Sequence, residues 1–503
     1  MFTKTRTIGL NGLNAYPITI EMDISRGMPN FDIIGSVDNV IKESRERIKI
    51  AARNIGIELP TRKIIISLTP SSVKKTGSVL DLAMFVALLK TMDILKQDFV
   101  NCAFFGELSL DGAINRIKGV LPMVIRAKAE GMTEIFVPFE NAFEASVIDG
   151  INVYPVRHIS ELTEHLRGDI HIPKQERYSP TITQKKTNDF CFVMGQQLAK
   201  FALEIAAAGG HNVLLIGPPG AGKSMLAKCI PSILPEMTFK ESVETTNIHS
   251  ICDILDKNNP LVTERPFRSP HHSISNVGLI GGGYPIHPGE ISMAHNGVLF
   301  LDEFPEFNKN ILEGLRQPLE DRTVTISRES GSADYPCSFI LIAAMNPCPC
   351  GYYGTSRCTC SKNAVQKYLS KVSGPMLDRF DMHIVVDAVE YKDLSSKKTE
   401  EPSVKIRERV EKARRIQTER FKGTEVSCNA QISDNLRLEF CRLDPSAEKE
   451  LETFFNTRGI SARGYTKILK VARTVADLDN SEFILKKHII QAIYFRSNNN
   501  YWQ

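Results

Sequence analysis

Hydrophobic and polar positions change their spacing repeatedly through the first third of the chain. Stretches with the pattern of half-buried strands alternate with stretches of helical period. The strand-like stretches are YPITIEMDI, RKIIISLT and EIFVPF, and the helix-like ones are ESRERIKIAARNIG and DLAMFVALLKTM. This alternation predicts an α/β or α+β domain over residues 1–170. Residues 171–189 are polar, contain prolines and lack periodicity, which predicts a linker.

A second pattern begins at residue 190. Short apolar stretches are separated by helical segments and glycine-rich loops, as in a mostly parallel sheet covered by helices. We assign this core to residues 190–392, with the strand-like stretches NVLLIG, GVLFLD, SFILIAAM and MHIVVDA. Residues 393–503 read as helical, with the stretches KIRERVEKARRIQTERF, AEKELETFFNTRG, SARGYTKILKVARTVADL and KKHIIQAIYF. The predicted fold class is therefore α/β, followed by a helical C-terminal domain.

The composition limits the class and location of the protein. The 503 residues are 42% hydrophobic and 24% charged, as in ordinary globular proteins, and the net charge of +4 is mild. An anionic partner would therefore need a local basic surface. No run approaches the roughly 18 apolar residues of a membrane span, and the N-terminus lacks the apolar core of a secretory signal. These features predict a cytoplasmic protein without membrane contact, in which the 11 cysteines are reduced.

The stretch GPPGAGKS fits the phosphate-binding pattern G-x-x-x-x-G-K-[ST] and lies between an apolar strand and a helix-compatible run. Its glycines allow backbone N–H groups to turn toward a β-phosphate at a helix N-terminus. Lys223 would neutralise the β- and γ-phosphates, and Ser224 would bind Mg²⁺. The predicted ATP cradle comprises Gly217, Pro218, Pro219, Gly220, Ala221, Gly222, Lys223 and Ser224.

Two later strands end in polar residues suited to hydrolysis. GVLFLDEF ends in Asp302, which is expected to hold Mg²⁺, and Glu303, which is expected to activate the attacking water. The next strand, FILIAAM, ends at Asn346, whose amide could hydrogen-bond the γ-phosphate or the water. Alone, an apolar run that ends in Asp-Glu is a weak signal. Its position after the phosphate-binding loop makes the assignment specific.

These motifs, in this order, resemble those of the AAA+ ATPases. Within them the chain resembles the magnesium-chelatase-like branch and its ComM/YifB-type bacterial members. The stretches that carry the resemblance are PFRSPHHSISNVGLIGGG, HPGEISMAHNGVLFLDEFPEF, LRQPLEDRTVTISR and SGPMLDRFDMHI. The resemblance implies a homo-hexameric ring with ATP between subunits. It also implies that Arg379 is the arginine finger offered to a neighbour and that Arg463 is the sensor arginine on the helical lid.

The N-terminal domain resembles the Lon-protease-like fold that this family carries before its ATPase core. A protease of that type needs a serine and a lysine. In KKTGSVLDLAMFVALL the nucleophile position holds Val79, with Ser78 one residue away, and no lysine falls at the catalytic place in FFGELSLDGAINRIKGVLP. We therefore expect a non-proteolytic domain for binding and assembly.

The resemblance to DNA translocases implies that DNA occupies the central channel of the ring. Two insertions would reach it. One is the glycine-rich stretch 273–292, flanked by His271, His272 and His287, and the other is the strand–turn–strand stretch 322–339 with Arg322 and Arg328. Arginines supply sequence-independent attraction to phosphates. The alternatives are a surface loop and solvated strand residues.

Four cysteines are arranged as two C-x-C pairs in MNPCPCGYYGTSRCTC. Cys348, Cys350, Cys358 and Cys360 would supply the thiolates of a closed, structural zinc site that stiffens the loop after Asn346. Reduced free thiols and a redox-sensitive loop are the alternatives. Cys337 is expected not to be a ligand.

Together these features predict an ATP-hydrolysing AAA+ ring motor, a DNA translocase or branch-migration helicase in recombination or natural transformation. Its cofactors would be ATP and Mg²⁺, with structural Zn²⁺ at the cysteines. The alternatives are the motor subunit of a magnesium chelatase and a Lon-like ATP-dependent protease. An assembly scaffold that hydrolyses little ATP is a fourth hypothesis.

Overall fold

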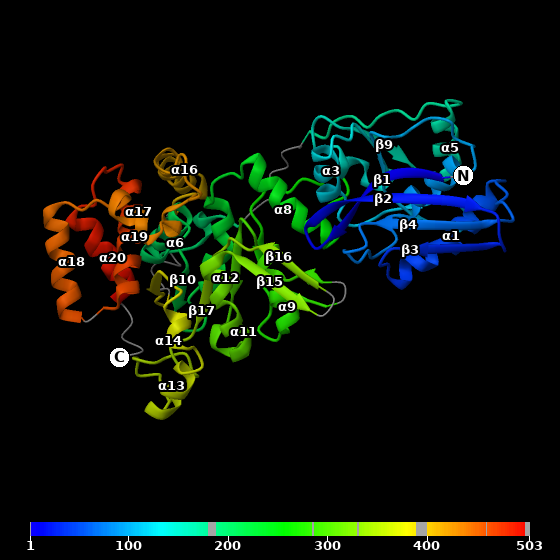
Figure 1. Cartoon of the computed structure of the whole chain (residues 1–503). Helices are drawn as coiled ribbons and strands as arrows, with labels where there is room; N and C mark the ends of the chain where they lie inside the picture. The colour runs from blue at the N-terminus through cyan, green and yellow to red at the C-terminus, as the bar shows by residue number, and fades with distance from the viewer. Residues whose placement is uncertain are drawn as a thin grey trace.

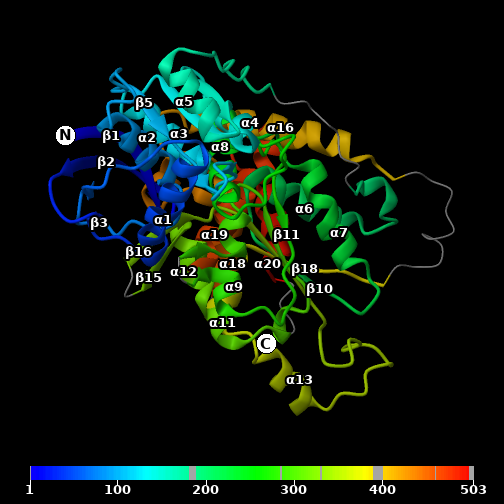
Figure 2. The same ribbon diagram turned by 90° about the vertical axis from the view of Figure 1, so that its right-hand side faces the viewer.

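The computed structural model describes residues 2–179, 188–283, 286–328, 331–388, 400–458 and 460–497. Three regions follow one another along the molecule (Figure 1). The N-terminal region is blue to cyan, the central sheet region is green, and the C-terminal helices are orange to red. Helix α13 (Lys362–Leu369) and the loop before it project from the lower edge of the molecule in both views (Figures 1 and 2).

The N-terminal region has two sheets. A four-stranded sheet has the order β1-β2-β4-β3, and a three-stranded parallel sheet has the order β5-β8-β9. In β2, Ile18, Ile20, Met22 and Ile24 are buried and alternate with more exposed residues, as the strand pattern predicts. The strands of the first sheet are β1 (Phe2–Asn11), β2 (Asn14–Ser25), β3 (Asn30–Ile34) and β4 (Lys63–Thr69). Those of the second are β5 (Cys102–Phe104), β8 (Glu134–Pro138) and β9 (Asn152–Val156).

Helices cover these sheets. Helix α1 (Asn39–Asn54) begins after Asp38, whose side chain accepts a hydrogen bond from the backbone of Ile41. Helix α2 (Asp81–Thr91) is apolar on nearly all sides and is buried. The remaining elements are α3 (Val120–Ala129), α4 (Ala142–Ala145), α5 (Ile159–Arg167) and the short pair β6 (Glu107–Leu108) and β7 (Ile114–Asn115).

The central region is built on a five-stranded parallel sheet of order β11-β14-β17-β10-β18. The predicted parallel sheet is thus confirmed. Strands β10, β14 and β17 are completely buried, which explains their continuous apolar sequences. The strands are β10 (Val213–Ile216), β11 (Phe267–Arg268), β14 (Val298–Leu301), β17 (Ile340–Met345) and β18 (Met382–Val385). Its helices include α6 (Gln197–Gly209), α7 (Lys223–Cys229), α8 (Phe239–Ile251), α9 (Asn276–Ile280), α10 (Glu290–Met293), α11 (Lys309–Gly314), α12 (Arg316–Asp321) and α14 (Gly374–Leu377).

The C-terminal region is helical, as predicted. Leu203 of α6, Val410 of α16 and Leu469 of α19 belong to one apolar core, so this region packs directly on the sheet region. The helices are α16 (Ser403–Arg420), α17 (Asp434–Phe440), α18 (Pro445–Arg458), α19 (Ala462–Leu478) and α20 (Lys486–Ser497). The boundary expected at 392/393 and residues 180–187 of the expected linker lie outside the described residues. These boundaries remain predictions.

Among the described residues, the N-terminal region contacts the central region around α8 and at a hairpin of the central region. At α8, the backbone N–H of Gly119 donates to the carbonyl of Ser250 at 3.2 Å, and the Ser250 hydroxyl donates to the buried Glu144. At the other place, the turn between β1 and β2 lies against a hairpin of β15 (Thr323–Arg328) and β16 (Gly331–Pro336). A Cβ at Gly12 would lie 2.8 Å from that of Ala333, so a larger residue would separate the two regions.

No helix within the described ranges is both long and apolar enough to span a bilayer.

Candidate nucleotide site

The glycine-rich loop connects β10 to α7, as the motif requires. Gly220 and Gly222 have φ angles of 76° and 85°, in the left-handed region that favours glycine. Gly217 is required for a different reason, because a Cβ there would lie 2.1 Å from the carbonyl oxygen of Val386. The three glycines therefore let the loop turn tightly and pass close to the neighbouring strand.

Lys223 occupies the centre of this loop. Its amine donates to the carbonyls of Gly217 and Pro218 at 2.7 and 2.9 Å and to the amide oxygen of Asn346 at 3.1 Å. Burial lowers the pKa of Lys223, and the nearby carboxylate of Asp302 only partly opposes this effect. A triphosphate would supply the negative charge that this buried amine lacks.

Two oxygen groups suited to Mg²⁺ meet beside the loop. The Ser224 hydroxyl donates to the Asp302 carboxylate at 2.5 Å. Hydroxyl and carboxylate oxygens are the ligands that Mg²⁺ takes at phosphate sites, so this pair fits the ion. Glu303 follows in a left-handed conformation, with a φ of 51°, which turns its side chain away from the strand direction.

Asn346 reaches the site because β17 lies between β10 and β14. The carboxyl ends of these parallel strands meet at one edge of the sheet, where ligands bind in open α/β sheets. A cavity of about 800 Å³ opens there, large enough for a nucleotide. Its lining residues include Gly220, Lys223, Ser224, Asp302, Glu303 and Asn346.

The two predicted arginines lie elsewhere. Arg379 and Arg463 line a second cavity, of about 870 Å³, with Glu320 between them. The Arg379 guanidinium lies 2.7 Å from the Glu320 carboxylate, and that of Arg463 lies 4.0 Å from it. The Arg379 side chain is almost fully buried, and its Nε has no hydrogen-bond partner among the described residues. The structure thus brings the two arginines together, but neither lines the Lys223 cavity of the same chain.

His272, expected to flank a stretch that contacts DNA, lies beside Glu303 at the nucleotide site, a position that the motifs did not predict. Its Nδ1 lies 3.1 Å from the Glu303 carboxylate, and its ring lies against that of His271, with centroids 4.0 Å apart and the planes tilted by 35°. The stretch SPHH contains His272, but it lies far from Glu303 along the chain. Nothing in the sequence therefore indicates that the two side chains are in contact. Lys367 and Lys371, in and after α13, also line the first cavity without having been predicted.

The two stretches predicted to contact DNA lie side by side. A Cβ at Gly281 would lie 2.5 Å from Ile326, and one at Gly282 would lie 3.1 Å from the Arg328 guanidinium. Arg322 instead points to Ser338, with 3.2 Å between the guanidinium and the hydroxyl. Of the paired stretches, residues 284–285 and 329–330 lie outside the described part.

In the N-terminal region, Ser78 and its nearest lysine along the chain have separate partners. The Ser78 hydroxyl donates to Glu107, whereas the buried Lys75 amine donates to the carbonyls of Gly35 and Pro70. Val79, at the nucleophile position, packs in apolar clusters. The lysine nearest to Ser78 along the chain is therefore bonded to backbone carbonyls and not to the Ser78 hydroxyl.

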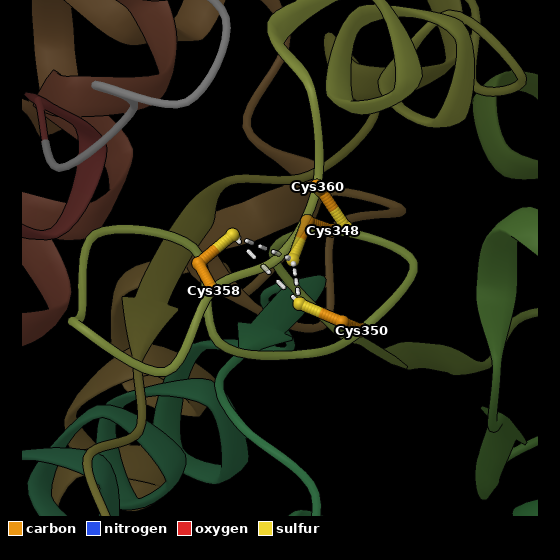
Figure 3. Close-up of side chains that lie close together, drawn as sticks. All are labelled: Cys348, Cys350, Cys358 and Cys360. Atoms are coloured by element: carbon orange, nitrogen blue, oxygen red, sulfur yellow. Dashed lines mark hydrogen bonds between the residues drawn. The ribbon is translucent and has the colours of Figure 1, made fainter.

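The four cysteines of the C-x-C pairs form one cluster, with their sulfur atoms all within 4.8 Å of one another (Figure 3). The cluster lies between β17 and α13, immediately after Asn346. Cys337 is buried elsewhere, with its sulfur 3.9 Å from the carbonyl of Pro318.

Comparisons with known proteins find matches over nearly the whole chain. The family model for magnesium chelatase, subunit ChlI, matches residues 189–394, and the models for subunit ChlI of Mg-chelatase and the ChlI C-terminal part match 20–141 and 400–496. Competence protein ComM of Haemophilus influenzae is 37% identical over 492 residues, which are 97% of this chain and 96% of ComM. Protein YifB of Escherichia coli is 37% identical over 488 residues, 97% of this chain and 95% of YifB. Lon protease of Mycolicibacterium smegmatis is 25% identical over 166 residues, 31% of this chain and 21% of Lon.

Proposed function

The chain belongs to the ComM/YifB-type family of magnesium-chelatase-like AAA+ proteins, and from this premise we propose that it is an ATP-driven ring motor that moves along DNA. The observation that carries the ATPase part is the meeting of Lys223, Ser224, Asp302 and Asn346 at the carboxyl edge of one parallel sheet. Phosphoanhydride hydrolysis needs charge neutralisation, metal ligands and a base, and this edge provides all three.

Each residue has a defined part in the reaction. Lys223 exchanges its carbonyl partners for the β- and γ-phosphates of ATP, which restores its charge balance. Ser224 and Asp302 would hold Mg²⁺, which would supply positive charge to neutralise the phosphate oxygens. Glu303 accepts the proton of the attacking water, and Asn346 orients the γ-phosphate or that water.

The arginine cavity completes the site of a neighbouring subunit. Because Arg379 and Arg463 lie together and apart from the Lys223 cavity of their own chain, both act in trans. A head-to-tail interface closes into a ring when its rotation closes, and we propose such a ring of six subunits. Within each subunit we propose a non-proteolytic Lon-like domain (1–170), a linker (171–189), an ATPase core (190–392) and a helical lid (393–503).

DNA occupies the channel of this ring. The hairpin of β15 and β16 and the adjacent glycine-rich stretch form one element, with Arg328 at its exposed end. A glycine-rich backbone can approach phosphates closely, and the arginine adds attraction that does not depend on sequence. The relative ComM is named a competence protein, which supports a role in natural transformation. We propose branch migration during recombination or natural transformation as the activity, and the cytoplasm as its place.

The test is the ATPase rate with and without single-stranded, forked and four-way-junction DNA. DNA should stimulate hydrolysis, and Glu303→Gln should abolish hydrolysis while ATP binding remains. Arg328→Ala should lose the stimulation but keep the rate without DNA, with Lys422→Ala as an exposed basic control. Hydrolysis that no DNA stimulates would reject the DNA part of the proposal and leave the ATPase part intact.

A magnesium-chelatase motor is the second candidate, favoured by the descriptions of the matching family models. That activity would show as stimulation by a porphyrin-binding partner instead of DNA. A Lon-like protease is not proposed, because Ser78 is paired with Glu107 and Lys75 with backbone carbonyls.

A further inference from the structure

Four thiols converge in the loop between β17 and α13. The Cys348 sulfur lies 3.4 Å from that of Cys350 and 4.0 Å from that of Cys358, and the latter two are 3.7 Å apart. Figure 3 shows these three side chains directed toward one another, with Cys360 beside Cys348. All 11 cysteines are free thiols, so disulfide bonds do not explain this arrangement.

The sulfur separations match those of a tetrahedral metal site. With Zn–S bonds of about 2.3 Å, the sulfurs of a zinc tetrathiolate are about 3.8 Å apart. The separations of 3.4, 3.7 and 4.0 Å lie on both sides of this value, and no pair exceeds 4.8 Å. Thiolates are soft ligands that select zinc over magnesium or calcium.

The loop backbone is shaped around the sulfurs. The backbone N–H groups of Tyr352 and Thr359 face the Cys350 sulfur, and that of Cys360 faces the Cys358 sulfur. Gly351 and Gly354 have φ angles of 87° and 83°, which let the chain fold back between the two C-x-C pairs. Amide donors spread the negative charge of a tetrathiolate, so the loop fits a bound divalent ion.

The same loop forms part of the wall of the nucleotide cavity. Pro349, between the first two cysteines, lines that cavity. A Cβ at Gly351 would lie 2.4 Å from Pro219 of the phosphate-binding loop, so the two loops are in direct contact. Asn346 precedes the cluster, and α13, which carries Lys367 into the cavity, follows it.

We propose that Cys348, Cys350, Cys358 and Cys360 bind one Zn²⁺ and that this ion holds the wall of the nucleotide cavity against the phosphate-binding loop. Binding releases four thiol protons and leaves a tetrathiolate of charge −2, in which all four positions are filled and none is open for catalysis. The second half of the proposal rests on the proposed nucleotide site, whereas the first half does not.

The first experiment measures metal in full-length protein purified without an affinity metal, with no nucleotide present. Elemental analysis should find about one zinc per chain. Cys358→Ser should lose most of it, whereas Cys191→Ser, a matched half-buried cysteine outside the cluster, should keep it. Wild-type chain stripped with a chelator and given Co²⁺ should show the charge-transfer and visible bands of a tetrahedral cobalt thiolate. The cobalt measurement uses only the wild-type chain, so its result does not depend on whether a variant folds.

Absence of zinc from reduced wild-type protein, together with absence of the cobalt bands, would overturn the metal site. Bound iron in place of zinc would overturn the assignment of the ion.

The second experiment measures binding of a fluorescent ATP analogue before and after zinc removal. Zinc-free chain should bind it about tenfold more weakly, a difference of about 1.4 kcal/mol, and added Zn²⁺ should restore the affinity. Circular dichroism checks that the stripped chain stays folded. Unchanged affinity in zinc-free chain would overturn the link between the two sites. If the zinc-bound chain binds no nucleotide at all, the proposed function fails, whereas the metal site stands.

Discussion

Replacing Asn346 with aspartate would put a carboxylate where an amide oxygen now accepts a hydrogen bond from Lys223 at 3.1 Å. The new charge would compete with the triphosphate for this lysine and repel the γ-phosphate. Two unit charges about 4 Å apart interact by about 4 kcal/mol at an effective dielectric constant of 20. Since Mg²⁺ and solvent reduce this repulsion, we expect a loss of about 2–4 kcal/mol in ATP binding, or about 30- to 1,000-fold.

The assay compares the affinities of fluorescent ATP and ADP analogues for wild type, Asn346→Asp and Asn346→Ala. The aspartate variant should lose far more affinity for ATP than for ADP, because only ATP has the γ-phosphate. The alanine variant lacks one hydrogen bond to a charged amine but adds no charge, so it should lose at most about 1.5–3 kcal/mol of affinity, and by a similar amount for ATP and ADP. Asn258→Asp, an exposed amide outside the cavity, is the charge control. Equal losses for ATP and ADP in Asn346→Asp would refute the placement of this side chain.

Three further outcomes follow from side-chain contacts. His272→Ala removes the imidazole whose Nδ1 lies 3.1 Å from the Glu303 carboxylate, so that the carboxylate is no longer held in place. The substitution should lower kcat about tenfold with KM unchanged, and His272→Gln should restore part of the rate. Ser250→Ala removes the hydroxyl that bonds buried Glu144 across two regions; urea unfolding should show a loss of about 1–2 kcal/mol. Burial would raise the pKa of Asp381, but the lysine and histidine beside it lower the pKa well below its usual range. The ionised Asp381 carboxylate therefore stabilises the folded protein above about pH 4, and this contribution is lost as the pH falls. Asp381→Asn should lower the free energy of unfolding at pH 7, whereas in acid its free energy of unfolding should equal that of wild type.

The sequence predicted the local elements well because their signals are local. The apolar strands and the phosphate-binding loop needed only short-range rules, and Gly220 and Gly222 do adopt left-handed conformations. Asp302 and Asn346 could be placed together because parallel strands share an edge.

Contacts between distant segments could not be derived in this way. The pairing of His272 with Glu303 depends on how two loops turn after their strands, and no spacing rule encodes it. The position of Arg463 depends on how α19 packs, so a motif could assign its role but not the cavity that it shares with Arg379. Arg322 itself has a left-handed backbone conformation at the end of α12. Its side chain therefore bonds to Ser338 instead of pointing to the end of the hairpin.

The central claim is that a neighbour's arginine completes the nucleotide site, and mixed rings test it most directly. Lys223→Ala and Arg379→Ala should each be nearly inactive alone, since an arginine finger contributes about 10³-fold or more to kcat. In an equal mixture with subunit exchange, about a quarter of the interfaces pair an intact Lys223 with an intact Arg379, so about a quarter of the wild-type ATPase rate should return. If two-tag purification shows that both variants share rings and no activity returns, or if Arg379→Ala alone keeps the wild-type rate, the claim is contradicted.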